Sequence, residues 1–272
     1  MTSRSTRSVL ITGGGRGLGR AIGVRLAEAG ATVGALARTE SEVHQTVSLI
    51  RDQGGIAIPL VADVLDTASL EPAVKRFNAE AGGIDALVCA AGRLAAIGPL
   101  ESVDPAAWRL DLETALIGTY QTIRYALPFL RDSKRGSISV LVGPGHNGEL
   151  AYASAYAAAH AGLVRLVETL DSELAKACVR VYAVNPGVVA TALVQNLLDD
   201  RDARKWLPRF TETFAEGKEV GPEIVSEMIA WLVDRRPIEL SGRVVAAMQS
   251  PDFLETRLER VEEHDLGVLR IR

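Results

Sequence analysis

The stretch Val9-Leu10-Ile11-Thr12-Gly13-Gly14-Gly15-Arg16-Gly17-Leu18-Gly19 decides the fold of this 272-residue chain. A short apolar run passes directly into a glycine-rich loop, and a segment with apolar residues at helical spacing follows the loop. Glycines at such a junction let the backbone turn tightly and approach a pyrophosphate at the positive end of the helix. The order of strand, glycine loop and helix therefore predicts a dinucleotide-binding unit at the start of the chain.

The rest of the chain continues the alternation of short apolar runs with longer segments of helical period. This pattern predicts βαβ units with right-handed crossovers, and thus a parallel sheet with helices on both faces. The predicted strands are Val9–Thr12, Thr32–Ala37, Ile56–Ala62, Ala86–Ala90, Ser137–Val142, Val179–Val184 and Arg243–Ala247. The predicted helices cover about 18–29, 40–53, 67–81, 104–131, 152–177 and 222–234. The expected fold is a single-domain, Rossmann-like, doubly wound α/β fold with about seven strands.

One segment, 188–221, is too long for a simple connection between a helix and a strand. Ligands of open parallel sheets lie beyond the carboxyl ends of the strands, so this segment is predicted to form a lid over the ligand. Its apolar residues suit either an apolar substrate under a movable cover or a lid that packs on itself; they are Leu193, Leu197, Leu198, Trp206, Phe210 and Phe214. The domain is expected to span 1–250, and the tail 251–272 to form a docked helix or a frayed end.

Composition and charge exclude several classes of protein. The chain is 47% hydrophobic and carries a formal charge of -4, so it offers no broad basic surface to a nucleic acid. Two cysteines, Cys89 and Cys178, are too few for a disulfide framework and fit a reducing cytoplasm. No run has the length of a signal sequence or a membrane helix, so a soluble, cytoplasmic protein without a membrane partner is expected. No metal site is predicted.

The glycine loop belongs to a wider pattern. The spacing of Gly13, Gly17 and Gly19 resembles the TGxxxGxG signature of the short-chain dehydrogenase/reductases. Further matches follow in order: Asp63-Val64, Ala90-Ala91-Gly92, Tyr156, and Asn185-Pro186-Gly187 with Thr191. The resemblance implies an oxidoreductase that binds a nicotinamide cofactor and acts on a carbonyl or hydroxyl group. The cofactor-binding residues that it implies are Gly13, Gly15, Arg16, Gly17, Leu18, Gly19, Arg38, Asp63, Val64, Ala90, Ala91, Gly92, Tyr156, His160, Pro186, Gly187, Val189 and Thr191.

Two cations favour NADP over NAD as the cofactor. The second predicted strand ends in Leu36-Ala37-Arg38 with no carboxylate at its tip, and Arg16 lies in the glycine loop on the same side. An acidic residue there would bind the ribose 2′-hydroxyl of NAD, whereas arginine accommodates the 2′-phosphate of NADP. We therefore expect NADPH to be preferred. The resemblance also implies that Asp63 binds the adenine amino group.

The catalytic positions match the family unevenly. Tyr156 begins Tyr-Ala-Ala-Ala-His, so that His160 stands where the family pattern YxxxK has lysine. Gly143 stands about thirteen residues before the tyrosine, at the position of the family's serine, and Ala115 at that of its asparagine. The predicted catalytic residues are Tyr156, His160 in the lysine's place, and His146 as a substitute group; the alternative for His146 is a polar loop residue.

Three functions remain open on these residues. The first is an NADP(H)-dependent oxidoreductase for a small apolar substrate, with Tyr156 as acid and base in an atypical proton relay. The second is a non-redox enzyme that keeps the cofactor pocket and catalyses isomerisation, dehydration or cyclisation. The third is a cofactor-binding, catalytically weak subunit of a hetero-oligomer. The resemblance implies a homodimer or homotetramer whose subunits pair through the helices at about 104–131 and 152–177.

Overall fold

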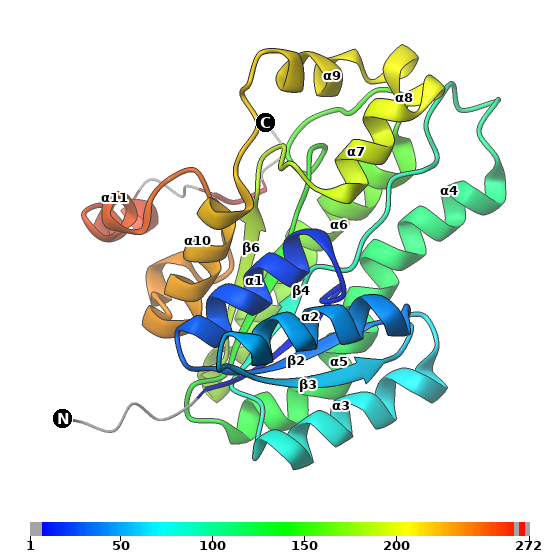
Figure 1. The fold of residues 1–272 in the computed structure, drawn as a ribbon. Helices are drawn as coiled ribbons and strands as arrows, with labels where there is room; N and C mark the ends of the chain where they lie inside the picture. Colours follow the sequence, from blue (N-terminus) through cyan, green and yellow to red (C-terminus); the bar gives the residue numbers. More distant parts are fainter. Residues whose placement is uncertain (1–6, 264–266, 270–272) are drawn as a thin grey trace.

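The computed structural model describes residues 7–263 and 267–269, with most of their side chains. Its strands form one parallel sheet in the order β3-β2-β1-β4-β5-β6-β7, which confirms the predicted doubly wound fold (Figure 1). The strands are β1 (Ser8–Thr12), β2 (Thr32–Ala37), β3 (Ile56–Val61), β4 (Ala86–Cys89), β5 (Ser137–Leu141), β6 (Arg180–Asn185) and β7 (Val244–Ala246). The predicted boundaries agree to within one residue.

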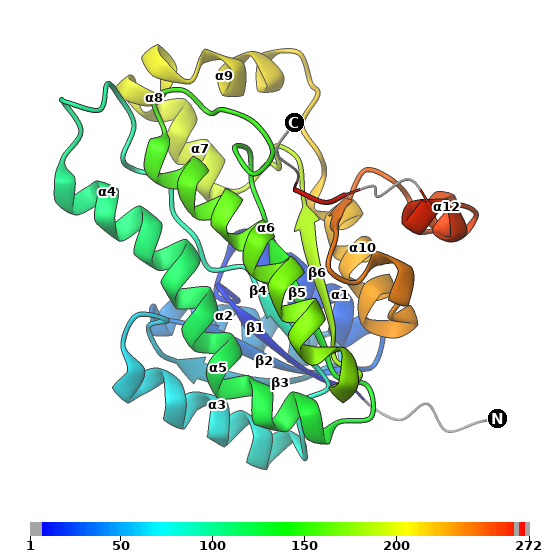
Figure 2. The ribbon, with the colours of Figure 1, turned by 180° about the vertical axis from the view of Figure 1, so that it is seen from behind.

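Two helical layers enclose the sheet. One face carries α1 (Gly17–Glu28), α2 (Glu40–Asp52) and α10 (Pro222–Arg235). The other carries α3 (Thr67–Ala81), α4 (Pro105–Leu112), α5 (Gly118–Asp132) and α6 (Ser154–Leu174) (Figure 2). Alternate residues of β1 serve the two layers, because Val9 and Ile11 pack in one core and Leu10 in the other, all fully buried. Burial on both faces explains why the strands are continuously apolar.

The predicted helix at 104–131 is a continuous helical stretch with an irregular centre. A π turn, η1 (Glu113–Ile117), joins α4 to α5. The predicted helix at 152–177 is α6 followed by a 3₁₀ turn, η2 (Ala175–Ala177). Among the described residues, no helix has both the length and the apolar character needed to cross a membrane.

The order of the strands reverses at β1, which pairs with β2 on one side and β4 on the other. Connections on the two sides of such a point run in opposite directions and leave a crevice at the carboxyl ends of the strands. Thr12 holds the two strand ends together there, because its Oγ1 accepts hydrogen bonds from the N–H groups of Ala90 and Ala91 at 3.2 and 3.3 Å. The glycine loop starts at this junction.

The segment 188–221 forms the short helices α7 (Ala192–Asp199), α8 (Arg201–Trp206) and α9 (Pro208–Ala215). They gather near the N-terminal ends of α4 and α6 in both views (Figures 1 and 2). A bridge between Val189 and Val220 closes the base of the segment.

The described part of the tail is docked. It forms α11 (Pro251–Glu255) and α12 (Leu258–Glu263), which follow the 3₁₀ turn η3 (Ile238–Leu240) and β7. Leu254, Leu258 and Val261 are buried in the core that α10 shares. Residues 264–266 and 270–272 lie outside the described part of the chain.

The amino end of the sheet is tied by Asp85. Its carboxylate accepts hydrogen bonds from the N–H of Ser8 at 3.0 Å and from the hydroxyl of Ser133 at 2.6 Å. Its main chain bonds Ser8 and Ser137 as well. One residue therefore joins β1, β4 and the start of β5 at the end opposite the glycine loop.

Candidate active site

A cavity of about 340 Å³ opens at the carboxyl ends of the strands. The loops that follow β1 to β6 all contribute to its lining. Every residue predicted to bind the cofactor lines it: Gly13, Gly15, Arg16, Gly17, Leu18, Gly19, Arg38, Asp63, Val64, Ala90, Ala91, Gly92, Tyr156, His160, Pro186, Gly187, Val189 and Thr191. The fold thus gathers residues from positions 13 to 191 in one place.

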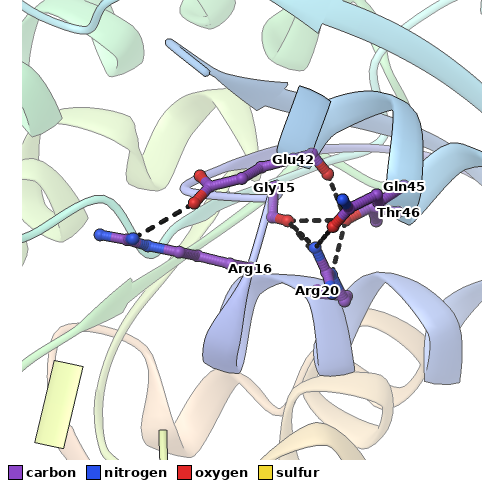
Figure 3. A network of polar contacts seen from close by, with 6 residues as sticks. All are labelled: Gly15, Arg16, Arg20, Glu42, Gln45 and Thr46. Carbon is purple, nitrogen blue, oxygen red and sulfur yellow. Dashed lines mark hydrogen bonds and ion pairs between the residues drawn. The ribbon is translucent and has the colours of Figure 1, made fainter. Parts of the chain in front are cut away.

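The glycine loop is held in shape by its neighbours. Gly13 has a positive φ of 66°, and a Cβ there would lie 2.8 Å from the carbonyl oxygen of Ala90, so a side chain is excluded. The carbonyl of Gly15 accepts hydrogen bonds from Nε of Arg20 at 3.1 Å and from the hydroxyl of Thr46 at 3.0 Å (Figure 3). The Thr46 hydroxyl also accepts from Nε of Arg20 at 3.0 Å. The loop is therefore fixed against α1 and α2, in a shape that suits a bound pyrophosphate.

The two predicted phosphate-binding cations have different surroundings. Arg38 is exposed and lines the cavity just after β2. Nη1 of Arg16 lies 3.2 Å from Oε1 of Glu42 on α2 (Figure 3). Glu42 lines the same cavity, so the charge of Arg16 is partly balanced before any ligand binds.

Two residues of the motifs that match the family also stabilise the loops that they stand on. Oδ1 of Asp63 accepts the N–H of Leu65 at 2.9 Å and holds the turn after β3. Oδ1 of Asn185 accepts the N–H of Gly187 at 2.9 Å and holds the turn after β6. Asp63 lines the cavity as well, so it combines this local role with a place beside the ligand site.

Tyr156 lies in the first turns of α6, beside His160. The centroids of the two rings are 4.0 Å apart and the rings are tilted by 41°. Burial, together with the carboxylate of Asp111, raises the pKa of Tyr156 above its usual value. The phenol is therefore protonated at neutral pH, which suits a proton donor and not a base.

His160 is buried and neutral. Its Nδ1 accepts the backbone N–H of Gly143 at 2.9 Å, so the ring proton lies on Nε2. Nε2 is buried without a hydrogen-bond partner among the described residues. Burial and the nearby His146 lower the pKa of His160 to about 4. The residue can donate a hydrogen bond from Nε2, but it does not carry the positive charge of a lysine.

Gly143 leaves room for the tyrosine. A Cβ at this position would lie 2.0 Å from the hydroxyl oxygen of Tyr156. Any side chain at position 143 therefore needs Tyr156 to move. Ala115 is buried on the π turn.

The structure does not bring His146 into this cavity. His146 is buried with Nδ1 2.9 Å from the carbonyl oxygen of Gly143, and it lines a separate cavity beside β7 and α11. His146 is absent from the residues that line the Tyr156 cavity, and its nearest effect on the site is that it helps to lower the pKa of His160. Its predicted catalytic role stays a prediction.

Several lining residues are not revealed by the sequence pattern, above all Arg93, whose partner is Asp111. Nε of Arg93 lies 2.6 Å from Oδ1 of Asp111, whose side chain is fully buried. The position of Arg93 directly after Ala90-Ala91-Gly92 is the signal that could have identified it. Other unpredicted lining residues include Thr39, Glu42, Leu94 and Thr114.

The 188–221 segment contributes apolar side chains to the site. Val194 and Leu197 line the cavity. Trp206 lies outside the lining and packs on Tyr152, with ring centroids 4.5 Å apart. The side chains of Leu193, Phe210 and Phe214 lie outside the described part of the structure.

Comparison with known proteins assigns the family. The sequence profile described as short chain dehydrogenase matches residues 7–202. The chain is 33% identical over 250 residues to the cis-4-hydroxycyclohexanecarboxylate dehydrogenase of Sinomonas cyclohexanicum, covering 88% of this chain and 94% of that protein. It is 31% identical over 265 residues to the short chain dehydrogenase mpl6 of Monascus purpureus, covering 95% and 86%.

A solved structure agrees with this assignment. A variant of actinorhodin polyketide ketoreductase with NADPH matches with a TM-score of 0.81 at 26% identity, over 90% of this chain and 97% of that one. Members of the matched family are oxidoreductases that bind a nicotinamide cofactor. From the profile, the relatives and the site together, we conclude that this chain belongs to the short chain dehydrogenase family.

Proposed function

We propose that the protein is an NADP(H)-dependent oxidoreductase that interconverts a carbonyl and a hydroxyl group on a small substrate with an apolar body. The observation that carries the proposal is the single cavity in which the glycine loop, Arg38 and the Tyr156–His160 pair meet. The names of the relatives support redox chemistry over the two alternatives, a non-redox enzyme and a catalytically weak subunit.

The residues of the cavity fit a nicotinamide dinucleotide. The fixed glycine loop at the N-terminus of α1 suits the pyrophosphate, and exposed Arg38 suits a 2′-phosphate. Arg16 adds a second cation, weakened by Glu42. When bound, the cofactor supplies or accepts a hydride.

Tyr156 is proposed as the proton donor to the carbonyl oxygen. Its raised pKa keeps the phenol protonated, and the neighbouring His160 is neutral and cannot lower that pKa as a positive charge would. The neutral His160 supplies a hydrogen bond from Nε2 instead. These properties favour reduction of a carbonyl over oxidation of an alcohol near neutral pH.

The substrate is proposed to lie between Tyr156 and the 188–221 segment, which we propose acts as a lid. Leu94, Val194 and Leu197 form an apolar wall there. We also propose that two subunits pair through α5 and α6. Ile117, at the end of η1, and Tyr120 on α5 are exposed in the single chain, and such a pairing would cover them.

The test compares cofactor binding with cofactor consumption. NADPH and NADH are titrated by fluorescence quenching, and NADPH consumption is then followed with cyclic ketones, including 4-oxocyclohexanecarboxylate because of the relative from Sinomonas cyclohexanicum. We expect turnover by the wild type and none by Tyr156→Phe, while Tyr120→Phe, an exposed tyrosine on α5, keeps it. Tight NADPH binding without consumption with any ketone would refute the oxidoreductase.

A further inference from the structure

We propose that Arg93 is a specificity-determining residue that binds a carboxylate on the substrate, so that the protein acts on oxo acids or hydroxy acids with an apolar body. The inference rests on the proposed function, because it places the carboxylate on the molecule that reacts at Tyr156. It assigns a role to a cation that lines the cavity beyond the glycine loop and Arg38.

The contacts of Arg93 leave its binding edge free. Nε lies 2.6 Å from Oδ1 of Asp111, and 27% of the side chain is exposed. Neither terminal nitrogen donates a hydrogen bond to a residue in the described part of the chain, although Arg93 lines the cavity with Tyr156. A guanidinium presents its N–H groups as a planar fork that matches the two oxygens of a carboxylate.

Asp111 is fixed without the help of Arg93. Its Oδ2 accepts the backbone N–H groups of Ala95 and Ala96 at 2.8 and 2.7 Å, and its side chain has no exposed surface. These bonds already hold the loop after β4 against α4. The ion pair is therefore not needed to anchor the loop, and its effect is to orient Arg93. An oriented guanidinium loses less conformational freedom when it binds a ligand.

The pair lies close to the reacting group. The Asp111 carboxylate acts electrostatically on the Tyr156 phenol, so the two lie in one electrostatic environment. Leu94, which follows Arg93, packs with Leu197 and Tyr156. A ligand that reaches Tyr156 thus meets an apolar wall and a guanidinium, a combination that suits an apolar ring or chain with one anionic group.

The experiment uses probes that differ only in charge. Cyclohexanecarboxylate and cyclohexanecarboxamide have the same ring and nearly the same shape, and their binding to the NADPH-saturated protein is measured by calorimetry. We expect the acid to bind about ten times more tightly than the amide, the scale of a charged hydrogen bond. Arg93→Gln should reduce this ratio to about one. Arg93→Lys should restore it only in part, because lysine keeps the charge but lacks the fork.

A kinetic arm uses 3- and 4-oxocyclohexanecarboxylate and the matching amides with NADPH. The ratio of kcat/KM for acid to amide should fall about tenfold in Arg93→Gln, while kcat/KM for the amides stays near the wild-type value. The matched control is Arg109→Gln, on the same helix as Asp111 but 77% exposed and paired with Glu113. It should change neither ratio.

The outcomes separate the two proposals. Three outcomes would overturn the role of Arg93. The acid and the amide bind equally, the acid does not bind at millimolar concentration, or Arg93→Gln loses affinity for the acid and the amide alike. Loss of NADPH affinity in Arg93→Gln would assign the residue to cofactor binding and would also overturn its role in substrate specificity. Discrimination of the acid without turnover of any ketone would support Arg93 and contradict the oxidoreductase alone.

Discussion

Gly143 and His160 share a hydrogen bond in which the glycine N–H donates to Nδ1 of the histidine at 2.9 Å. The bond determines the tautomer of His160, because a ring nitrogen that accepts cannot carry the proton. His160 is thus a neutral donor at Nε2. The geometry of the site is organised around this contact between Gly143 and His160.

The buried His160 makes stability depend on pH. Its pKa is lowered from 6.5 to about 4 in the folded protein, so between these values the unfolded chain binds a proton that the folded chain does not. The contribution of His160 to the free energy of unfolding is therefore fully present above pH 6.5. It is lost as the pH drops toward 4, by roughly 3 kcal/mol in total. Urea unfolding at several pH values measures this. His160→Gln should flatten the dependence, whereas His44→Gln, at an exposed position on α2, should not; the same slope in all three proteins would contradict the assignment.

The raised pKa of Tyr156 predicts a difference between the two directions of reaction. The phenol stays protonated below its pKa, so carbonyl reduction should show no loss of rate attributable to the tyrosine between about pH 6 and 9. Alcohol oxidation needs the ionised form and should rise continuously with pH over the same range. The measurement is kcat in both directions across this range. A plateau of the oxidation rate below about pH 8 would mean that a cation lowers the pKa of Tyr156 in the working enzyme.

Gly143→Ala tests the contact between this glycine and Tyr156. The added methyl group would lie 2.0 Å from the tyrosine hydroxyl, so the ring must shift. We expect a loss of about 1 to 3 kcal/mol in unfolding free energy, typical of overpacking, and a loss of most of the turnover. Calorimetric unfolding and NADPH consumption give the two values. Gly148→Ala, in the same loop with open space around it, is the matched control and should behave as the wild type.

Cofactor preference tests the two arginines near α2. Arg38→Ala should reduce the preference for NADPH over NADH by about 10- to 100-fold, the scale of a charged hydrogen bond. Glu42→Gln should act in the opposite direction, because it frees Arg16 from its ion pair and removes a negative charge from the cavity lining. Fluorescence titration with both cofactors measures the ratio. Arg131→Ala, at an exposed position on α5, should leave it unchanged; equal affinity of the wild type for both cofactors would contradict the assignment.

The fold was predictable because its signals are local. Each strand is a short apolar run, and burial on both faces made the runs continuous, so the boundaries follow from hydropathy alone. The glycine loop was predictable for the same reason, since its glycines stand together directly after the first strand. The π turn at Glu113–Ile117 has no such pattern, and it interrupts a helix that periodicity predicts as regular.

The site was predictable only in part because its chemistry depends on contacts between distant residues. Nothing in the sequence around Arg16 indicates Glu42, which approaches it from α2. Arg93, in the loop after β4, pairs with Asp111 on α4. Nδ1 of His146 lies 2.9 Å from the carbonyl oxygen of Gly143, a contact that depends on the turn between them. The sequence identifies which residue types stand after each strand, whereas tertiary packing decides which of them pair.

Asp85 lies at the end of the sheet remote from the cavity, where it binds Ser8 and Ser133. Asp85 joins β1, β4 and β5, and none of its hydrogen-bond partners in the described part of the chain lines the cavity. Stability and substrate range can therefore be engineered at opposite ends of the sheet. Changes at this end, such as a library around Asp85 and Ser133, can be screened for thermal tolerance alone. Changes at the opposite end can be screened for substrate range, and the two sets of improvements should combine additively because the residues share no partner.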